Sequence, residues 1–394
     1  MKRRTVKTVS ILGGLAAALA VTVSAQRPAS APIPNLEGKI LTVTGPIDPA
    51  QLGVTLMHEH IFIDFQSPVP RPPSRATDLN LRDQPITLEN VYAARTGRGG
   101  IRNGFLGDFD TSLDEVMAFK NRGGDAIVDV SNIGLGRDPG ALQRISNASG
   151  LKVVMGAGWY QKAFHPLDMD QRTVEQLTDV IVHDITVGAE GTNIRSGIIG
   201  EVGINGNPLT TNELKSTRAS GRAARLTGAP ITFHVGGEGE EKFQVLDVLA
   251  SEGVDLHHVT MGHSNRWSND YPFMKRLFAR GVFVEFDYLG APGGPGGWLG
   301  AMDDQKVANG IAELVKMGYA DRIVLAHDVC TKIQLKKYGG NGFTYINDYF
   351  LPALERLGVS QSDIHKMMVD NPRKALVFAA PQPQVTSAGA TASR

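Results

Sequence analysis

Residues 53–61 read Gly-Val-Thr-Leu-Met-His-Glu-His-Ile, so an apolar run ends in two histidines, His58 and His60. A short apolar run of this kind is typical of a buried β-strand. Side chains alternate along a strand, so the two imidazoles are expected to point the same way. Two imidazoles that converge at a strand end supply half of a metal site. A His-x-His pair also arises by chance at packed or surface positions, so the interpretation depends on further ligands downstream.

Seven further apolar runs follow the first, and amphipathic helical patterns separate the later ones. Strand–helix alternation repeated eight times predicts an α/β fold of the (β/α)8 type, the TIM barrel, preceded by a short β-hairpin around residues 39–43. A doubly wound open sheet is the second interpretation, but no G-x-G-x-x-G opens a helix after the first strand and no P-loop is present. The predicted strands are 54–60, 126–131, 152–160, 197–203, 230–235, 259–263, 282–287 and 323–328, and the clearest helices are 211–226, 240–251, 271–280 and 304–317.

Further metal-ligand residues stand at the predicted strand ends. Chemistry in a barrel of this type takes place where the carboxyl ends of the strands meet. Four imidazoles and two carboxylates there are enough for two divalent cations, which a glutamate can bridge. Glu201, which ends the run Ile-Ile-Gly-Glu in the fourth strand, is the candidate bridge. The other candidates are His58 and His60 (first strand), His234 (fifth), His263 (sixth) and Asp328 (eighth).

The segments around these residues resemble the phosphotriesterase family of the amidohydrolase superfamily, and the likeness extends from about residue 43 to residue 378. The resemblance implies that a more buried metal ion is bound by His58, His60 and Asp328. It implies that His234 and His263 bind a more exposed ion and that a bridging residue holds both. The matching segments are Met57-His58-Glu59-His60, Val128-Asp129-Val130-Ser131, Gly197-Ile198-Ile199-Gly200-Glu201-Val202-Gly203, Gly228-Ala229-Pro230-Ile231-Thr232-Phe233-His234, Gly262-His263-Ser264, Ala326-His327-Asp328 and Asp370-Asn371-Pro372.

At the bridging position the chain departs from part of that family. Organophosphate hydrolases and the related lactonases carry a carbamylated lysine there, whereas Glu201 resembles the bridge of the phosphotriesterase homology proteins. A glutamate is shorter, so the metal spacing and the pocket are expected to differ. The lactonases also carry an arginine after the seventh strand, where this chain has Asp287 and Tyr288. Tyr160, after the third strand, matches a lactonase tyrosine near the metals.

The site predicts a binuclear metal-dependent hydrolase that cleaves an ester bond in a lactone, another carboxylic ester or a phosphate ester. Two divalent ions lower the pKa of a bridging water to give hydroxide, and the more exposed ion polarises the C=O or P=O oxygen. Asp328 is expected to take the proton and help pass it to the leaving group. Zn²⁺ is the expected metal, although the ligands also accept Mn²⁺, Co²⁺ or Fe²⁺. Two alternatives are a mononuclear amidohydrolase or deaminase-like enzyme and a secreted metal-binding protein without catalysis.

Loops on the catalytic rim are expected to contact the substrate. Tyr160 follows the third strand, and Trp298 lies in the Gly- and Pro-rich loop 291–300, which is expected to form a lid or an apolar substrate wall. The long loop 65–107 is expected to cover the site.

The beginning of the chain has the pattern of a secretory signal peptide, with a basic head, an apolar stretch and a small-residue cleavage site. The pair Arg3-Arg4 also resembles a twin-arginine export signal. The enzyme is therefore expected in the periplasm or outside the cell, without a membrane span once the signal is removed. The expected boundaries are 1–25 for the signal peptide, 26–35 for a flexible leader, 36–380 for the hydrolase barrel and 381–394 for a disordered tail.

Charge and cysteine content narrow the class of protein further. The chain has 40 basic and 40 acidic residues, and removal of residues 1–25 takes away four basic and no acidic ones, which leaves 36 against 40. This slight negative excess argues against a nucleic-acid partner. The expected partner is a small-molecule ester substrate. Whether the chain forms a homodimer is left open. Cys330 is the single cysteine, so no internal disulfide is expected.

Overall fold

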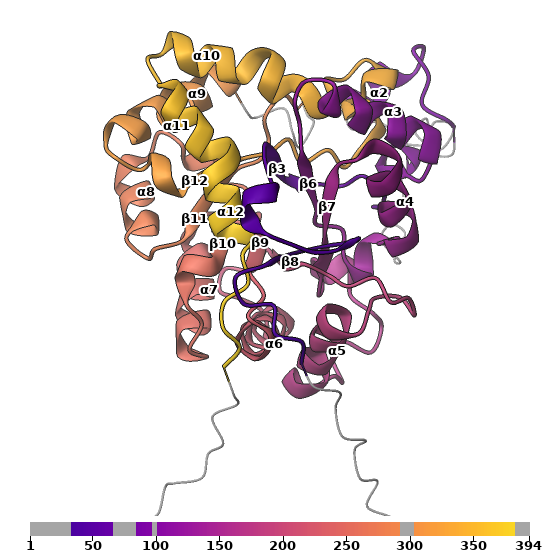
Figure 1. Ribbon diagram of the computed structural model, residues 1–394, viewed down its shortest axis with the longest axis vertical. Coiled ribbons are helices and arrows are strands. Elements are labelled where there is room, and N and C mark those ends of the chain that lie inside the picture. Colours follow the sequence, from indigo (N-terminus) through magenta and orange to yellow (C-terminus); the bar gives the residue numbers. More distant parts are fainter. Residues whose placement is uncertain (1–32, 66–83, 97–100, 292–302, 383–394) are drawn as a thin grey trace, which may run out of the picture. The chain divides into compact units, whose positions relative to one another are not determined.

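Eight parallel strands form a nearly closed barrel in the computed structural model, which describes residues 33–65, 84–96, 101–291 and 303–382 (Figure 1). The strands pair in chain order, each with its neighbour, and the order shows no reversal. The TIM barrel prediction is therefore confirmed, and the doubly wound sheet, whose strand order reverses in the middle, is wrong. The strands are β3 (Thr55–Glu59), β6 (Ala126–Asp129), β7 (Lys152–Ala157), β8 (Ile198–Ile204), β9 (Ile231–Val235), β10 (Val259–Met261), β11 (Phe283–Phe286) and β12 (Ile323–Leu325).

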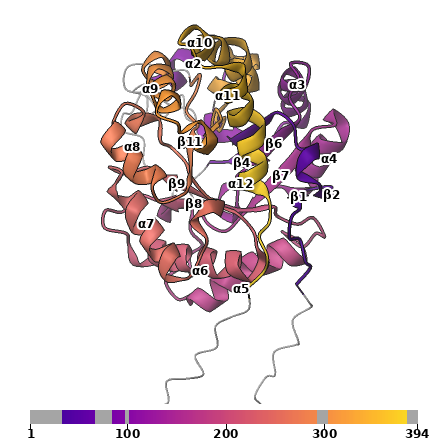
Figure 2. The same ribbon diagram turned by 60° about the vertical axis from the view of Figure 1, so that its left-hand side comes forward.

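Helices follow the strands and surround the sheet, and Figure 2 shows α5 to α9 succeeding one another around its outside. Local sequence explains where they begin and end. In α6, for example, Thr210 and Glu213 form a capping box at the N-terminus, and Gly228 ends the helix with a φ of 78°. The helices are α2 (Val91–Arg95), α3 (Phe109–Lys120), α4 (Pro139–Ser149), α5 (Val174–Thr186), α6 (Thr211–Thr227), α7 (Glu240–Ser251), α8 (Tyr271–Phe278), α9 (Asp304–Lys316), α10 (Leu351–Arg356), α11 (Gln361–His365) and α12 (Asn371–Leu376).

Two small hairpins accompany the barrel. The predicted N-terminal hairpin is confirmed, because β1 (Ile40–Thr42) pairs antiparallel with β2 (Gly45–Ile47). A second pair, β4 (Ile63–Asp64) and β5 (Phe105–Leu106), follows the first barrel strand and had no clear sequence signal.

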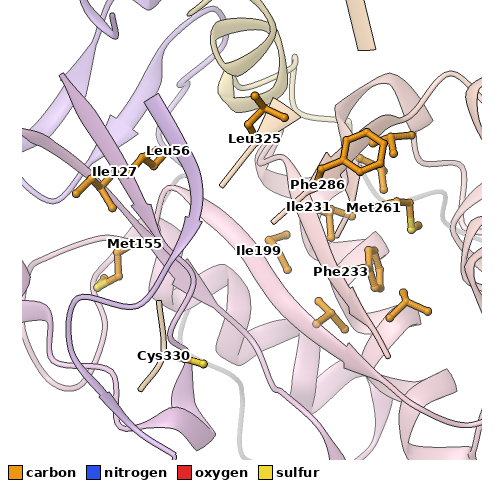
Figure 3. Packing of buried hydrophobic residues seen from close by; sticks show 14 of the residues in the cluster. Leu56, Ile127, Met155, Ile199, Ile231, Phe233, Met261, Phe286, Leu325 and Cys330 are labelled. Atoms are coloured by element: carbon orange, nitrogen blue, oxygen red, sulfur yellow. The ribbon is translucent and has the colours of Figure 1, made fainter. Parts of the chain in front are cut away.

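The two faces of the barrel sheet bury different apolar side chains. The larger cluster lies between strands and helices, and Figure 3 shows side chains from it. The smaller cluster takes residues from six of the barrel strands and includes Val128, Phe283 and Val324. Because side chains alternate along a strand, these residues face the barrel interior. Glu285 and Asp287 follow Phe283 two and four positions later, so their side chains also lie on the interior face, closer to the carboxyl ends of the strands.

Several expectations concern residues that the structure does not describe. The signal peptide (1–25), residues 26–32 of the leader, residues 383–394 of the tail, and Trp298 with most of its loop lie outside the described residues. The structure therefore leaves these expectations as predictions. Among the described residues, none of the helices combines the length and the apolar character needed to cross a membrane.

Candidate metal centre

The structure brings all six sequence-predicted ligands together at the carboxyl ends of the barrel strands. His58 lies in β3 and His60 directly after it, while Glu201 and His234 lie within β8 and β9. His263 and Asp328 follow the ends of β10 and β12. All six side chains are buried. Strands far apart in the sequence thus contribute to one polar cluster above the apolar interior.

One group of ligand atoms forms around His60. Its Nε2 lies 3.2 Å from Oδ1 of Asp328 and 3.2 Å from Oε1 of Glu201. Nε2 of His58 lies 3.9 Å from the same Asp328 oxygen. His58, His60 and Asp328 each offer a ligand atom, and these atoms all lie within 4.8 Å of one another. We call these three residues the first ligand group.

A second group lies on the other side of Glu201. Oε2 of this carboxylate is 3.3 Å from Nδ1 of His234 and 3.8 Å from Nε2 of His263, and the two imidazole nitrogens also contact each other. We call His234 and His263 the second ligand group. The Glu201 carboxylate thus turns Oε1 toward His60, and Oε2 toward both His58 and the second group, so it contacts both ligand groups as a bridging carboxylate must.

Two buried atoms of this cluster support a cation between the groups. Among the described residues, Nε2 of His58 and Oε2 of Glu201 have no hydrogen-bond partner, although they lie only 3.3 Å apart. Buried polar atoms without a partner are rare and call for an explanation such as an ion. Imidazole nitrogens and carboxylate oxygens, which make up the cluster, are ligand atoms that Zn²⁺ and similar divalent ions accept. The residues present therefore fit divalent metal ions.

A layer of supporting groups orients the imidazoles. Nδ1 of His58 donates to Glu285 at 3.0 Å, and Nδ1 of His263 donates to Asp287 at 3.0 Å. Nδ1 of His60 lies 2.9 Å from the Ser131 hydroxyl, which in turn donates to the carbonyl of Phe62. Each of these bonds leaves Nε2 of its histidine directed toward the ligand cluster. Such partners fix the tautomer and the ring orientation of metal-ligating histidines.

These supporting groups were not predicted from the sequence, although the sequence contains a signal for two of them. Residues 283–287 read Phe-Val-Glu-Phe-Asp, so two acids stand two positions apart in an otherwise apolar strand. Both carboxylates must then point to the same face. Ser131 carries no comparable signal, because its importance depends on the nearness of His60.

The backbone is unusual at two of the ligands. Three non-glycine residues in the described part of the chain have a positive φ, and two of them are His263 at 53° and Asp328 at 51°. A left-handed backbone costs free energy for these residue types, and such residues concentrate at functional sites. The His263 amide donates to Asp287 at 2.8 Å and the Asp328 amide donates to the carbonyl of His58 at 3.1 Å, which holds both conformations.

Charges in the cluster balance one another strongly. Burial disfavours a charged imidazole, yet the carboxylates of Glu201 and Glu285 outweigh it and raise the pKa of His58 well above its usual value. Burial also opposes the charge on His60, but hydrogen bonds with Asp328 and Glu201 raise its pKa to about 9. Burial by itself raises the pKa of Glu201, and the neighbouring histidines lower it well below the usual range. The cluster therefore favours positive charge between its carboxylates.

Aromatic side chains line the second ligand group. The Tyr160 hydroxyl lies 3.1 Å from Nδ1 of His234, so the structure brings this sequence-predicted substrate residue to the site. Phe164 packs against the Tyr160 ring with a centroid distance of 5.3 Å. Tyr288 stacks on the His263 ring at 4.3 Å, with 11° between the planes. Two phenols therefore flank the more exposed histidines.

Comparisons with known proteins find relatives along most of the chain. The model of the phosphotriesterase family matches residues 38–376. An N-acetyltaurine hydrolase of Xenopus tropicalis is 34% identical over 349 residues, which cover 87% of this chain and 99% of that protein. A phosphotriesterase-related protein of Nematostella vectensis is 36% identical over 357 residues, with 86% and 99% covered.

Solved structures of similar proteins show the same barrel. A resiniferatoxin-binding protein from Rhodobacter sphaeroides superposes with a TM-score of 0.80 at 36% identity, covering 87% of this chain and 96% of its own. The phosphotriesterase homology protein from Escherichia coli, complexed with phosphate in its active site, has a TM-score of 0.69 at 27% identity, with 83% and 99% covered. A lactonase from Listeria monocytogenes has a TM-score of 0.71 at 25% identity, with 86% and 99% covered.

Proposed function

The chain belongs to the phosphotriesterase family, and from that premise we propose that this hydrolase uses two divalent metal ions to cleave the acyl bond of a small N-acyl amide. The observation that carries the proposal is the Glu201 carboxylate, with one oxygen toward His60 and the other toward His234. A single-metal amidohydrolase or deaminase-like site needs no such bridge. A metal-binding protein without catalysis needs no carboxylate in the position of Asp328.

The relatives favour an amide over the ester that the sequence alone favoured. Proteins 32% to 34% identical to this chain are named N-acetyltaurine hydrolases, and the match covers nearly their whole length. Amides and carboxylic esters share an acyl carbon that a water molecule must attack, so one site suits both reactions. An amide also needs a proton on its leaving nitrogen, which gives the buried Asp328 carboxylate a second task. We therefore propose N-acetyltaurine as the first substrate to test.

Each group at the site has a separate role in the proposed hydrolysis. Bound metal ions supply an acidified water and polarise the acyl oxygen. Asp328 accepts the proton of the attacking water and delivers it to the leaving nitrogen. The Tyr160 hydroxyl, beside His234, donates a hydrogen bond to the acyl oxygen. Tyr288 and Phe164 narrow the substrate's path to the metal centre, so that the acyl group packs against their aromatic rings.

The number of metal ions separates the alternatives. The nitrogen and oxygen ligands are expected to hold Zn²⁺, and Mn²⁺, Co²⁺ or Fe²⁺ can replace it. Elemental analysis of protein purified without chelators is expected to give two ions per chain. One ion per chain in an active enzyme would support the mononuclear alternative and contradict the bridging role of Glu201.

A substrate panel tests the reaction. N-acetyltaurine, the acetyl ester of 2-hydroxyethanesulfonate, a γ-lactone and an aryl phosphate triester would be assayed with the metal-loaded enzyme. The amide and the ester differ only in the leaving atom, so their comparison isolates the bond type. We expect the highest kcat/KM for the amide and the lowest for the phosphate triester. Absence of hydrolysis of every acyl substrate by enzyme with two ions bound would overturn the proposal.

We also propose export, on the pattern of residues 1–25. Expression of the full chain in a bacterium with a periplasm is expected to yield a protein whose mass corresponds to a chain starting at Gln26. Replacement of Arg3 and Arg4 by lysine would block export only if the signal is of the twin-arginine type. Light scattering on the exported protein tests the homodimer, which stays a prediction.

A further inference from the structure

Glu59 stands between the ligands His58 and His60 but serves the opposite side of the strand. Its carboxylate is completely buried. Oε1 accepts hydrogen bonds from the backbone amide of His327 at 2.9 Å and from Nδ1 of the same residue at 2.7 Å. Oε2 accepts one from the amide of Val329 at 2.9 Å. One carboxylate thus holds both neighbours of Asp328.

These bonds lie at the seam where the barrel closes. β12 ends at Leu325, and the left-handed backbone of Asp328 interrupts regular pairing with β3. Two backbone bonds cross the seam, from the Asp328 amide to the carbonyl of His58 and from the His60 amide to the carbonyl of Val329, both at 3.1 Å. The Glu59 oxygens accept the amides on either side of Asp328, where strand carbonyls would accept them in a regular sheet. The seam and the first ligand group are therefore one hydrogen-bonded unit.

His327 connects Glu59 to the segment that follows the barrel. Its Nε2 accepts a hydrogen bond from the amide of Ile346 at 3.1 Å, so its Nδ1 carries the proton that Glu59 accepts. On the other side, Gln334 donates to the carbonyl of Asp328 at 2.7 Å. The His327 ring points away from the ligand cluster, because it contacts Glu59 and Ile346 instead.

We propose that Glu59 is a positioning residue that sets the Asp328 carboxylate against His58 and His60 by holding His327 and Val329. A buried carboxylate is a costly way to stabilise a fold, and a well-packed apolar side chain usually does so equally well. A carboxylate that accepts three N–H groups instead fixes their positions. The inference concerns ligand geometry. It rests on the proposed metal ions for its affinity readout and on the proposed reaction only for its activity readout.

The substitution Glu59→Gln tests the inference with little change of shape. The glutamine keeps one oxygen, but its NH2 group must face an N–H of His327 or Val329, so one donor loses its acceptor. Glu213→Gln is the matched control. Glu213 is also buried and also accepts three backbone amides, from Asn205, Gly206 and Thr210.

Three measurements are made on both variants: Co²⁺ binding by competition with a chelator, the absorption spectrum of bound Co²⁺, and kcat and KM for N-acetyltaurine. For Glu59→Gln we expect affinity for one of the two ions to fall by about 10- to 100-fold, as for other residues that support metal ligands. The Co²⁺ spectrum changes, and kcat falls by about tenfold or more while KM stays within about twofold. Glu213→Gln loses stability but keeps both ions, the spectrum and kcat.

Wild-type affinity and an unchanged Co²⁺ spectrum in Glu59→Gln would overturn the inference. If the wild-type enzyme hydrolyses no amide, the proposed function fails, but the affinity and the spectrum still decide the role of Glu59. If Glu59→Gln does not fold, His327→Leu and His327→Asn replace it. The asparagine keeps a donor toward Glu59 and is expected to restore the metal affinity that the leucine loses. Wild-type affinity in the leucine variant would also overturn the inference.

Discussion

Glu201 and Asp328 are buried carboxylates beside the same imidazoles, yet their surroundings give them different tasks. Both oxygens of Glu201 face histidines, at 3.2 Å from His60 and 3.3 Å from His234. Asp328 turns Oδ1 toward His60, and its pKa is lowered, because its hydrogen bond with His60 and the charge on His58 outweigh the effect of burial. A carboxylate that is ionised at neutral pH and lies beside the metal ligands suits a proton acceptor.

The substitution Asp328→Asn is expected to keep bound metal but to lose most turnover. The amide preserves the shape and one ligand oxygen, but it cannot accept a proton at neutral pH. We expect kcat for N-acetyltaurine to fall by about 10²- to 10⁴-fold. Steady-state kinetics and elemental analysis on the same preparation check this. A variant with near wild-type kcat and full metal content would exclude Asp328 as the proton acceptor.

Ser131 supports His60 through a single hydroxyl, so its removal tests the supporting layer. Ser131→Ala leaves Nδ1 of His60 without its partner and is expected to weaken metal binding by about 10- to 100-fold. Competition with a chelator measures the change. Ser146→Ala is a control, since this buried hydroxyl donates to the Leu151 carbonyl, away from the ligands. Equal affinity in the two variants would show that Ser131 does not orient His60.

Within the elements, the loop from β8 to α6 depends on one capping residue. Glu213 accepts the amides of Asn205, Gly206 and Thr210 and the hydroxyl of Thr210. Burial raises its pKa, but the hydrogen bonds from Asn205 and Thr210 outweigh that effect, so the folded-state pKa lies below the usual value. The stabilising contribution is therefore present above the unfolded-state pKa and is lost as the pH falls through the folded-state pKa.

Glu213→Gln is expected to lower the free energy of unfolding by about 1–2 kcal/mol at neutral pH, because buried amides lose a charged acceptor. The difference from wild type should shrink as the pH falls from about 4.5 toward the lowered folded-state pKa. Urea denaturation at neutral pH and at about pH 3 measures both effects. A difference that grows with acidity would contradict the assigned sign.

The strands show where local pattern predicts an element and where it does not. Every predicted strand is present, because apolar runs bounded by glycines and polar residues are a local property. Four predicted strands extended too far by two or more residues. The predictions 126–131 and 152–160 run past the ends of β6 at Asp129 and of β7 at Ala157. The other two run through the ligand candidates His263 and Asp328, whereas β10 ends at Met261 and β12 at Leu325. The left-handed backbone at both ligands breaks the ladder, and nothing in the local sequence encodes it.

For the whole molecule, the ligand cluster connects five strands around the barrel: β3, β8, β9, β10 and β12. Ions bound there would cross-link segments that are distant in the sequence, so metal binding is expected to stabilise the entire barrel. Free metal at 100 times its Kd adds about 2.7 kcal/mol for one site.

Removal of metal with a chelator is accordingly expected to lower the melting temperature, and added Zn²⁺ should restore it. Calorimetry on holo and metal-free protein checks this. Glu201→Ala, which loses the bridge, should melt near the metal-free wild type whether or not Zn²⁺ is present. An unchanged melting temperature after complete removal of metal from the wild type would contradict the cross-link.

The sequence by itself determined the barrel and placed the six candidate ligands at its carboxyl rim. Strand alternation, helix caps and polar residues at strand ends are local signals, and the carboxyl ends of parallel strands in a barrel meet at one rim. Those local signals are enough to place His58, Glu201 and Asp328 near one another. The family resemblance added the grouping of the ligands, which the distances around Glu201 are consistent with.

Only the tertiary structure decided how the ligands are held. His60 meets Ser131 across 71 residues, His58 meets Glu285 across 227, and Glu59 meets His327 across 268. Hydrogen bonds over such separations depend on how the barrel closes, and no period of the sequence specifies them. A buried acid such as Glu285 therefore looks like an ordinary strand residue in the sequence, and only the fold shows that it supports the candidate ligand His58.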